Sequence, residues 1–382
     1  MKLVTVLGGY GVFGSRISAV LAELPDVRVR IAGRRRKPGE ELARKIDGEF
    51  RECDATDRDS VRQAIDGSTL VVNTAGPFQG KDFRVAEQCI DCGSHYIDIA
   101  DGREFVCGIA ALHAAACERG LFVTSGASTV PAISDAMIRS VSAEFSTIDE
   151  IQIALSPGNK NPRGASTIAA ILSYVGRPIR VWQEKQWTAR PGWGDSRRLE
   201  FPPPVGFRRV YNCDGPDLEL VPAAWRAATV RFRAGVELRV INVSLACIAW
   251  IRRRICAWES LPRRAPLFLK LSLLLGWLGT SNGSLAVSIH GTDPHGAAHE
   301  RRVAIVTDTD GPAVPCAPAI LLASRILADG PPCTGAFPCT GFIDLDAALK
   351  HLEPHRVWCV RGDRHGWKAT CNRPAPPRTL DA

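Results

Sequence analysis

The chain has 382 residues, of which 45% are hydrophobic and 23% are charged, the composition of an ordinary globular protein. This length exceeds one core of common size, so we expect two domains. The net charge of +8 comes mainly from arginine pairs and triplets scattered along the chain. With no lysine-rich tail, this pattern argues against nucleic-acid binding.

Thirteen cysteines stand at irregular spacings, which is unlike the disulfide framework of a small secreted domain. We expect reduced thiols. Cys89 and Cys92 form a C-x-x-C pair, but the sequence has no second ligand pair at the spacing of a zinc site, so no metal site is predicted. The N-terminal apolar run is too short for a signal peptide, which favours a cytoplasmic protein.

Residues 4–36 have the order of the first β-α-β unit of a dinucleotide-binding fold. An apolar strand leads into Gly9-Tyr10-Gly11-Val12-Phe13-Gly14, which is followed by an amphipathic helix and a second strand. In such a loop the first glycine permits a tight turn, the second lets the backbone approach a pyrophosphate, and the third lets the helix pack closely. The sequence therefore predicts a nucleotide site at the helix N-terminus.

The second strand ends in Gly33-Arg34-Arg35-Arg36. Sites specific for NAD place an acidic residue about 20 positions after the last glycine, where it binds the ribose hydroxyls. No acidic residue stands here, and a guanidinium suits a 2′-phosphate in shape and charge. We predict that Arg34 and Arg35 select NADP(H).

Two later strands should complete the cofactor site, because ligands of an open α/β sheet lie beyond the carboxyl ends of its strands. One strand ends at Asp54, which we expect near the adenine. The other is followed by Asn73, Ala75, Gly76 and Pro77, which we expect near the nicotinamide. Helix capping by Asp54 and a plain tight turn are the alternatives. A strand over 121–124 would complete a doubly wound sheet.

From residue 126 the pattern changes to a short helix and then to strands such as 148–155. Their polar alternation is typical of an antiparallel sheet with one solvated face. Alternation returns over 284–307 as two strands joined by a turn over 290–299. Residues 318–327 predict a helix that can dock on the first domain, and the proline-rich residues 373–382 predict a disordered tail.

Residues 236–279 contain two apolar runs separated by Arg252-Arg253-Arg254 and Arg263-Arg264. Neither run reaches the ~20 apolar residues of a membrane span. Two helices with charged ends are expected instead. Such helices must bury their apolar faces, and we favour burial in the second domain together with a homodimer contact. A basic amphipathic helix on a membrane surface is the alternative.

Seven sequence patterns, in this order, resemble the saccharopine dehydrogenase-like family and cover most of the chain. They are Gly9 to Gly14 with Ala32-Gly33-Arg34, Asn73-x-Ala75-Gly76-Pro77, Gly93-x-x-Tyr96-x-Asp98, Pro131-Ala132-Ile133-Ser134, Arg163-Gly164-Ala165-Ser166-Thr167, Ala234-Gly235-x-Glu237 and Pro338-Cys339-Thr340-Gly341. The sequence departs from the family at Ala132, where glycine is usual, and over 100–104, which replace a shorter Gly-Glu turn.

The resemblance implies an α/β fold in which a Rossmann domain is followed by a mixed α+β domain and a segment that returns to the first. We expect an NADP-binding domain over 1–125, a substrate and dimerisation domain over 126–315, and a returning segment over 316–372. The family implies hydride transfer to or from a C=N bond of an amino-acid-derived substrate. Enoyl reduction of a lipid-like substrate and a non-catalytic NADP-binding sensor are the alternatives.

Hydride chemistry also needs a proton donor and a substrate anchor. Tyr96 and Asp98 end a sheet strand on the same side, and we predict that they manage the proton; a buried tyrosine with a hydrogen-bonded carboxylate is the alternative. Arg163, Ser166 and Thr167 precede an apolar run and predict a helix-start site for a substrate carboxylate, against an ordinary N-cap. No tyrosine is followed four places on by lysine, which disfavours the short-chain dehydrogenases.

Overall fold

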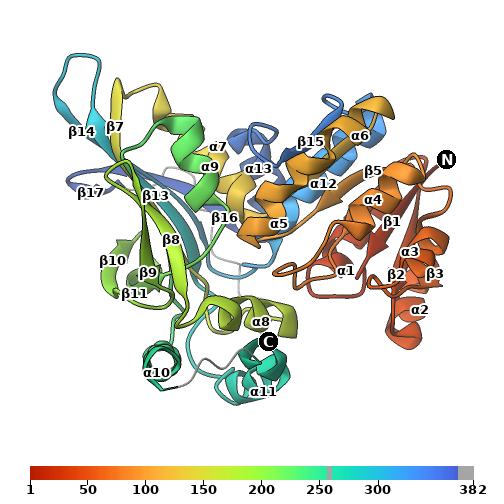
Figure 1. Ribbon diagram of the computed structural model, residues 1–382, viewed down its shortest axis with the longest axis horizontal. Helices are drawn as coiled ribbons and strands as arrows, with labels where there is room; N and C mark the ends of the chain where they lie inside the picture. The colour runs from red at the N-terminus through yellow and green to blue at the C-terminus, as the bar shows by residue number, and fades with distance from the viewer. Residues whose placement is uncertain (256–259, 369–382) are drawn as a thin grey trace, which may run out of the picture.

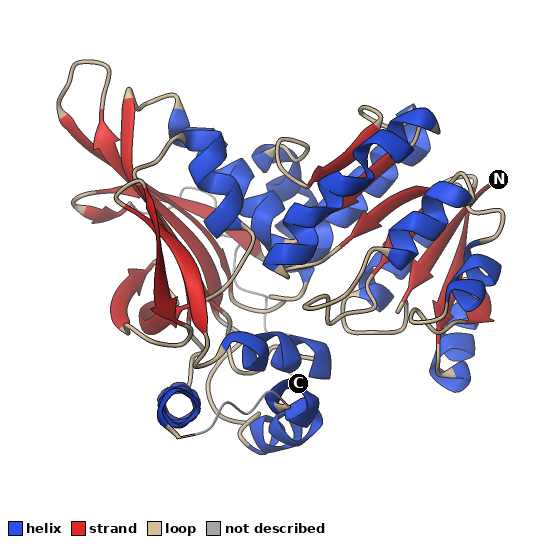
Figure 2. Ribbon diagram, viewed as in Figure 1, coloured by secondary structure: helices blue, strands red, loops and turns tan. Residues whose placement is uncertain are grey.

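The computed structural model describes residues 1–255 and 260–368 of the chain and shows two sheets joined by helices (Figures 1 and 2). The tail prediction for 373–382 lies outside these residues. The first sheet has seven strands, all parallel, in the order β15-β6-β5-β4-β1-β2-β3. The strands are β1 (Lys2–Leu7), β2 (Val27–Gly33), β3 (Glu49–Glu52), β4 (Leu70–Asn73), β5 (His95–Asp98), β6 (Phe122–Ser125) and β15 (Gly335–Pro338).

Helices connect these strands in a doubly wound arrangement, as the sequence predicts. They are α1 (Gly14–Ala22), α2 (Arg36–Lys45), α3 (Arg58–Ile65), α4 (Arg84–Asp91), α5 (Arg103–Gly108), a 3₁₀ turn (Ile109–Leu112) and α6 (His113–Glu118). The strand order reverses between β1 and β4, which run into the glycine loop and the 74–78 turn respectively. This is the position at which open α/β sheets bind ligands.

The second sheet is mixed rather than purely antiparallel, because β7 (Thr147–Ser156) runs parallel to β12 (Thr229–Ala234). On its other side β7 pairs antiparallel with β13 (Gly283–Thr292), which forms a hairpin with β14 (Ala298–Thr307). The remaining strands are β8 (Pro178–Gln183), β9 (Gln186–Pro191), β10 (Arg197–Phe201), β11 (Gly206–Asn212), β16 (Val357–Asp363) and β17 (Gly366–Trp367).

Helices of the second half lie between and around the sheets (Figure 1). They are α7 (Ser134–Ser142), which follows a short π-helical turn (Thr129–Ile133), α8 (Ala165–Tyr174), α9 (Asp217–Trp225), α10 (Arg239–Arg254), a 3₁₀ turn (Leu261–Arg264), α11 (Ala265–Leu274), α12 (Ala313–Asp329), α13 (Leu345–Leu352) and a 3₁₀ turn (Glu353–His355). The two predicted helices of the 236–279 segment are α10 and α11.

The C-terminal part of the chain is divided between the two domains. Helix α12 packs on α1, and β15 pairs with β6 at the edge of the first sheet, so the predicted return is confirmed for these elements. Strands β16 and β17 instead extend the second sheet from β14, which differs from the expected docking of 316–372 as one unit. One cluster of buried apolar side chains, which includes Val4 of the first sheet and Val287 of the second, runs through both domains.

Candidate nucleotide and substrate site

The glycine loop after β1 has the packing that a dinucleotide site needs. A Cβ at Gly14 would lie 2.4 Å from the carbonyl oxygen of Gly8 and 2.6 Å from Thr74 Oγ1, so only glycine lets α1 approach. A Cβ at Gly11 would meet the Gly8 oxygen at 3.1 Å and no other described atom within 4 Å, so it would project into the open space beside the loop. That is the space a pyrophosphate at the start of α1 needs.

Tyr10 connects the glycine loop to the basic end of β2. A Cβ on Gly33 would lie 2.7 Å from the Tyr10 ring, so the ring covers that glycine. The Tyr10 hydroxyl accepts a hydrogen bond from the backbone N–H of Arg35 at 2.9 Å, and the Arg35 guanidinium lies 5.1 Å from the ring centroid. Arg34 and Arg35 are exposed. The structure therefore brings Arg35 against the glycine loop, with Arg34 next to it in the chain.

Asp54 follows β3 and is held by its own loop. Its Oδ1 accepts hydrogen bonds from the Thr56 N–H at 2.9 Å and the Thr56 hydroxyl at 2.8 Å. These bonds, and then the charges of Arg34 and Lys81, lower the pKa of the Asp54 carboxyl. The helix cap of α3 is Asp57 rather than Asp54, because the Asp57 side chain accepts from the Asp59 N–H.

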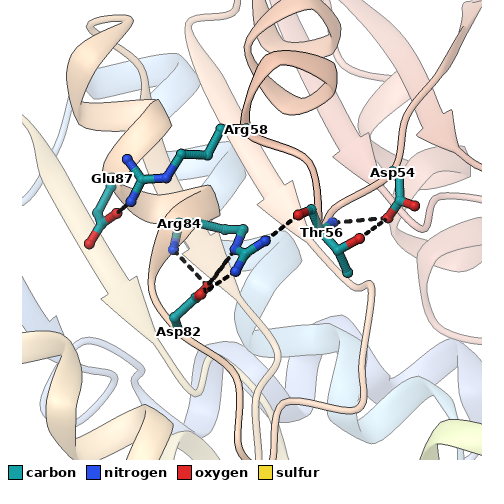
Figure 3. A network of polar contacts seen from close by, with 6 residues as sticks. All are labelled: Asp54, Thr56, Arg58, Asp82, Arg84 and Glu87. Atoms are coloured by element: carbon teal, nitrogen blue, oxygen red, sulfur yellow. Dashed lines mark hydrogen bonds and ion pairs between the residues drawn. The ribbon is translucent and has the colours of Figure 1, made fainter.

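A polar network holds this loop in place (Figure 3). Arg84 donates to the Thr56 carbonyl oxygen and, through Nε, to both Asp82 oxygens at 2.8 and 3.0 Å. Arg58 forms an ion pair with Glu87 beside it. The network joins the Asp54 loop to the segment before α4, which fixes the edge of the site where the adenine is expected.

Asn73, Tyr96 and Asp98 form a buried group at the carboxyl ends of β4 and β5. Asn73 Nδ2 donates to the Tyr96 hydroxyl at 3.1 Å, and Asn73 Oδ1 accepts from the Ala75 N–H at 3.0 Å. Asp98 Oδ1 accepts at 2.9 Å from the N–H groups of Ala100 and Gly126 and from a serine hydroxyl. These bonds anchor the loops that follow β4, β5 and β6.

Burial dominates the protonation of this group. It raises the pKa of Asp98 to about 6, against four donors that lower it, the Tyr96 hydroxyl among them, and it raises the pKa of Tyr96 with help from the Asp98 charge. Both side chains are 0% exposed, and neither lines the cavity described next. Their catalytic role stays a prediction, and the structure shows them as loop anchors.

A cavity of about 370 Å³ lies between the two domains and begins at the glycine loop. Phe13, Thr74, Gly76 and Pro77 line it from the first domain. Its other walls come from loops of the first domain, from the second sheet, from α8, α10 and α11 and from the start of α12. They are mainly apolar: Phe78, Ile99, Val130, Leu155, Ile168, Ile171, Leu172, Ile241, Leu245, Phe268, Leu285, Ile305 and Val314. Among the described residues that line it, Asp101 and Arg163 carry the charges.

The structure places all three predicted substrate residues on this cavity. Helix α8 begins after Gly164, whose extended backbone supplies the N-cap without a side-chain bond. Ser166 therefore does not cap the helix; its hydroxyl donates to the Gly76 carbonyl oxygen at 2.9 Å. This bond joins the start of α8 to the turn where the nicotinamide is expected.

Arg163 is held at the cavity by side-chain and main-chain acceptors. Its guanidinium donates to Asn159 Oδ1 and to the Ser272 carbonyl oxygen, both at 3.2 Å. Its Nε makes no hydrogen bond within the described residues, and burial lowers its pKa. Glu237 supports this loop by accepting from the Asn159 N–H at 2.8 Å. This bond gives the Ala234-Gly235-x-Glu237 pattern a structural role.

Asp101 and Gln79 are site residues that the sequence analysis missed. Both line the cavity, and Gln79 Nε2 donates to Asp101 Oδ1 at 2.9 Å. The Asp101 carboxyl keeps access to solvent, and the protein atoms around it at the cavity raise its pKa. One feature of the sequence points to Asp101: it lies in residues 100–104, where the chain departs from the family pattern.

Comparison with known proteins identifies the first domain. Residues 4–141, just over a third of the chain, match the family model of the saccharopine dehydrogenase NADP binding domain. This part of the chain therefore has the family that the sequence patterns indicate. No curated protein sequence matches the chain significantly.

Two solved structures share the whole architecture. Apo saccharopine dehydrogenase (L-Glu forming) from Saccharomyces cerevisiae superposes with a TM-score of 0.69 at 14% identity, over 95% of this chain and 100% of that one. The homospermidine synthase from Legionella pneumophila, in complex with NAD, superposes with a TM-score of 0.61 at 11% identity, over 94% of this chain and 91% of that one. At these identities the likeness confirms the fold class alone.

Replacing Tyr96 by Phe separates anchoring from proton transfer. The change removes the acceptor of the buried Asn73 amide, so we expect the free energy of unfolding to fall by about 1–3 kcal/mol, with kcat changed less than about threefold because the hydroxyl does not reach the cavity. Urea unfolding and steady-state kinetics measure the two effects. A loss of kcat of about 100-fold at unchanged stability would instead establish a catalytic hydroxyl.

Proposed function

We propose that this chain is an NADP(H)-dependent oxidoreductase that acts on an apolar substrate with one polar reacting end. The observation that carries the proposal is the mainly apolar cavity that begins at the glycine loop and at the Gly76-Pro77 turn. A site of this kind accepts an apolar chain and orients it with few polar groups. The family of the first domain supports the cofactor half of the proposal.

The described residues fit a dinucleotide. Gly9, Gly11, Gly14 and the backbone of Tyr10, Val12 and Phe13 would hold the pyrophosphate, Arg34 and Arg35 the 2′-phosphate, and the 73–77 turn the nicotinamide. The cofactor supplies the hydride when bound. The protein's part is to hold the substrate against that turn, exclude water and manage one proton.

The charge of the cavity favours the lipid-like alternative over an amino-acid-derived imine. A substrate made from two amino or oxo acids carries several carboxylates, and buried carboxylates need paired cations. Arg163 is the only cationic side chain among the described residues that line the cavity. One arginine suits one carboxylate or carbonyl, and the apolar walls suit a hydrocarbon chain.

Reduction of an α,β-unsaturated carbonyl compound fits these groups. Hydride addition at the β-carbon places negative charge on the carbonyl oxygen, and proton addition at the α-carbon completes the saturated product. Arg163 would stabilise the charge on that oxygen. Asp101, whose pKa is raised, would supply the proton and recover it from water. The C=N reaction is the second candidate and rests on the fold and on the resemblance.

Cofactor preference is tested by the double substitution Arg34→Ser and Arg35→Ser. We expect the Kd for NADPH to rise by about 10- to 100-fold, because two charged contacts to the 2′-phosphate are lost, and the Kd for NADH to change less than about threefold. Fluorescence titration of both cofactors measures this, with the exposed pair Arg44→Ser and Lys45→Ser as control. Equal affinity of the wild type for NADH and NADPH would refute the arginine argument.

The pH profile tests Asp101. Because its folded pKa is raised, the carboxyl keeps its proton to a higher pH than usual, and kcat should fall as the pH rises through that value. Asp101→Asn should lower kcat by about 100-fold or more and remove this fall. Glu104→Gln, on the exposed side of α5, is the control. An unaltered pH profile in Asp101→Asn would exclude Asp101 as the donor.

A further inference from the structure

The exposed apolar side chains of this protein are concentrated on two helices. Of the eleven large hydrophobic residues with high exposure among the described residues, nine lie within 240–277. We call them the α10–α11 face: Val240, Val243, Trp250, Ile255, Leu267, Leu271, Leu273, Leu274 and Trp277. A cluster of nine exposed large apolar side chains on a globular protein marks a contact surface.

The spacing of these residues gives each helix an outward apolar side. Val240, Val243 and Trp250 recur at helical spacing along α10, and Leu267, Leu271 and Leu274 along α11. The exposed fractions of the α11 residues are 52–69%. Figure 1 shows both helices at the lower edge of the molecule, with α8 above α11.

Helix α11 is apolar on its inner side as well. Phe268 and Ser272 line the cavity, and the helix packs on α8. A helix as apolar as this one is normally buried, yet α11 has protein on one side and its outer leucines are exposed. The same helix therefore separates the cavity from whatever covers the α10–α11 face.

The charges beside the face have one sign. Exposed basic side chains border the apolar residues: Arg239, Arg253, Arg254, Arg263, Arg264 and Lys270. Between Glu237 and Asp293 the sequence has one acidic residue, Glu259, which lies outside the described residues. The face thus combines leucine and tryptophan with arginine and lysine, the pattern of helices that lie in a bilayer interface.

We propose that the α10–α11 face docks on the surface of an anionic bilayer. Its apolar side chains would enter the interface and its basic side chains would bind the headgroups. No helix in the described parts of the chain is long and apolar enough to cross a bilayer, so the contact is one of surface binding.

A second copy of the chain is a poorer occupant of this face. In a two-fold contact the same patch meets itself, and the basic residues of both copies would approach without described acidic partners. Like charges brought together at an interface oppose association. A homodimer, which the sequence analysis favours, would be better formed through another surface.

Docking would also let a lipid-like substrate enter the cavity from the bilayer, an inference that rests on the proposed function. Ile241 and Leu245 of α10 and Phe268 of α11 are cavity walls, so the helices that would lie in the interface also enclose the site. An acyl chain could then pass from the bilayer to the cavity without crossing water. Each methylene buried in the cavity would raise the binding constant about fourfold.

Vesicle flotation of the full chain tests the docking. At low salt we expect the protein to float with phosphatidylglycerol–phosphatidylcholine vesicles, and to stay behind with pure phosphatidylcholine or at high salt. Replacing Arg253, Arg254, Arg263 and Arg264 by Ser should reduce binding at least about tenfold, as should Leu271→Ser with Leu274→Ser. The control replaces four exposed arginines elsewhere, Arg44, Arg62, Arg119 and Arg364, by Ser and should bind within twofold of wild type.

Failure to float at low salt, or an equal loss in the control, would overturn the proposal. So would sedimentation equilibrium that shows a dimer broken by the Leu271→Ser and Leu274→Ser pair. NADPH titration of each variant keeps the two claims apart. A wild-type chain that binds NADPH but does not float refutes docking alone, whereas a wild-type chain that floats but does not bind NADPH refutes the proposed function alone.

Discussion

The hydrogen bond from Ser166 to the Gly76 carbonyl oxygen fixes where the two halves of the site meet. It joins the first turn of α8, in the second domain, to the turn after β4, at the position where the first sheet binds ligands. Because it links a side chain of α8 to the backbone of the turn after β4, the contact bridges the two domains. The cavity lies directly beside it.

The walls of the cavity depend on a second set of contacts behind α8. Glu237 accepts from the N–H groups of Asn159 and Thr280 at 2.8 and 2.9 Å, and Asn159 Nδ2 donates to the Leu275 and Leu278 carbonyl oxygens. One buried carboxylate thereby joins the Arg163 loop, the start of α10 and the end of α11. A network of this kind is worth more than its separate bonds, and it keeps an apolar helix at the edge of the protein.

The first domain could be predicted from the sequence because its signals are local. The glycine loop, the arginines after β2 and the turn after β4 each follow a strand at a fixed spacing. The mixed second sheet could not, because the parallel β7–β12 pair and the return of β16 to β14 join segments distant in the chain. Alternation indicates a half-buried strand but not its neighbour.

The candidate site shows the same division. The sequence places Arg163 and Ser166 at the start of α8, but it does not show the bond from Ser166 to Gly76, which only the domain arrangement reveals. Tyr96 and Asp98 share a strand side, as expected, yet the sequence cannot show that loops after β5 and β6 cover them. Asp101 was missed because its role depends on a cavity formed by distant helices.

The central claim is that an apolar substrate meets the cofactor in this cavity. Its most direct test is kcat/KM with NADPH for a homologous series of 2-enoyl compounds of increasing chain length. Each methylene that the cavity buries should raise kcat/KM about three- to fourfold until the cavity is filled. A flat dependence on chain length, or turnover confined to lysine with 2-oxoglutarate, would contradict the account.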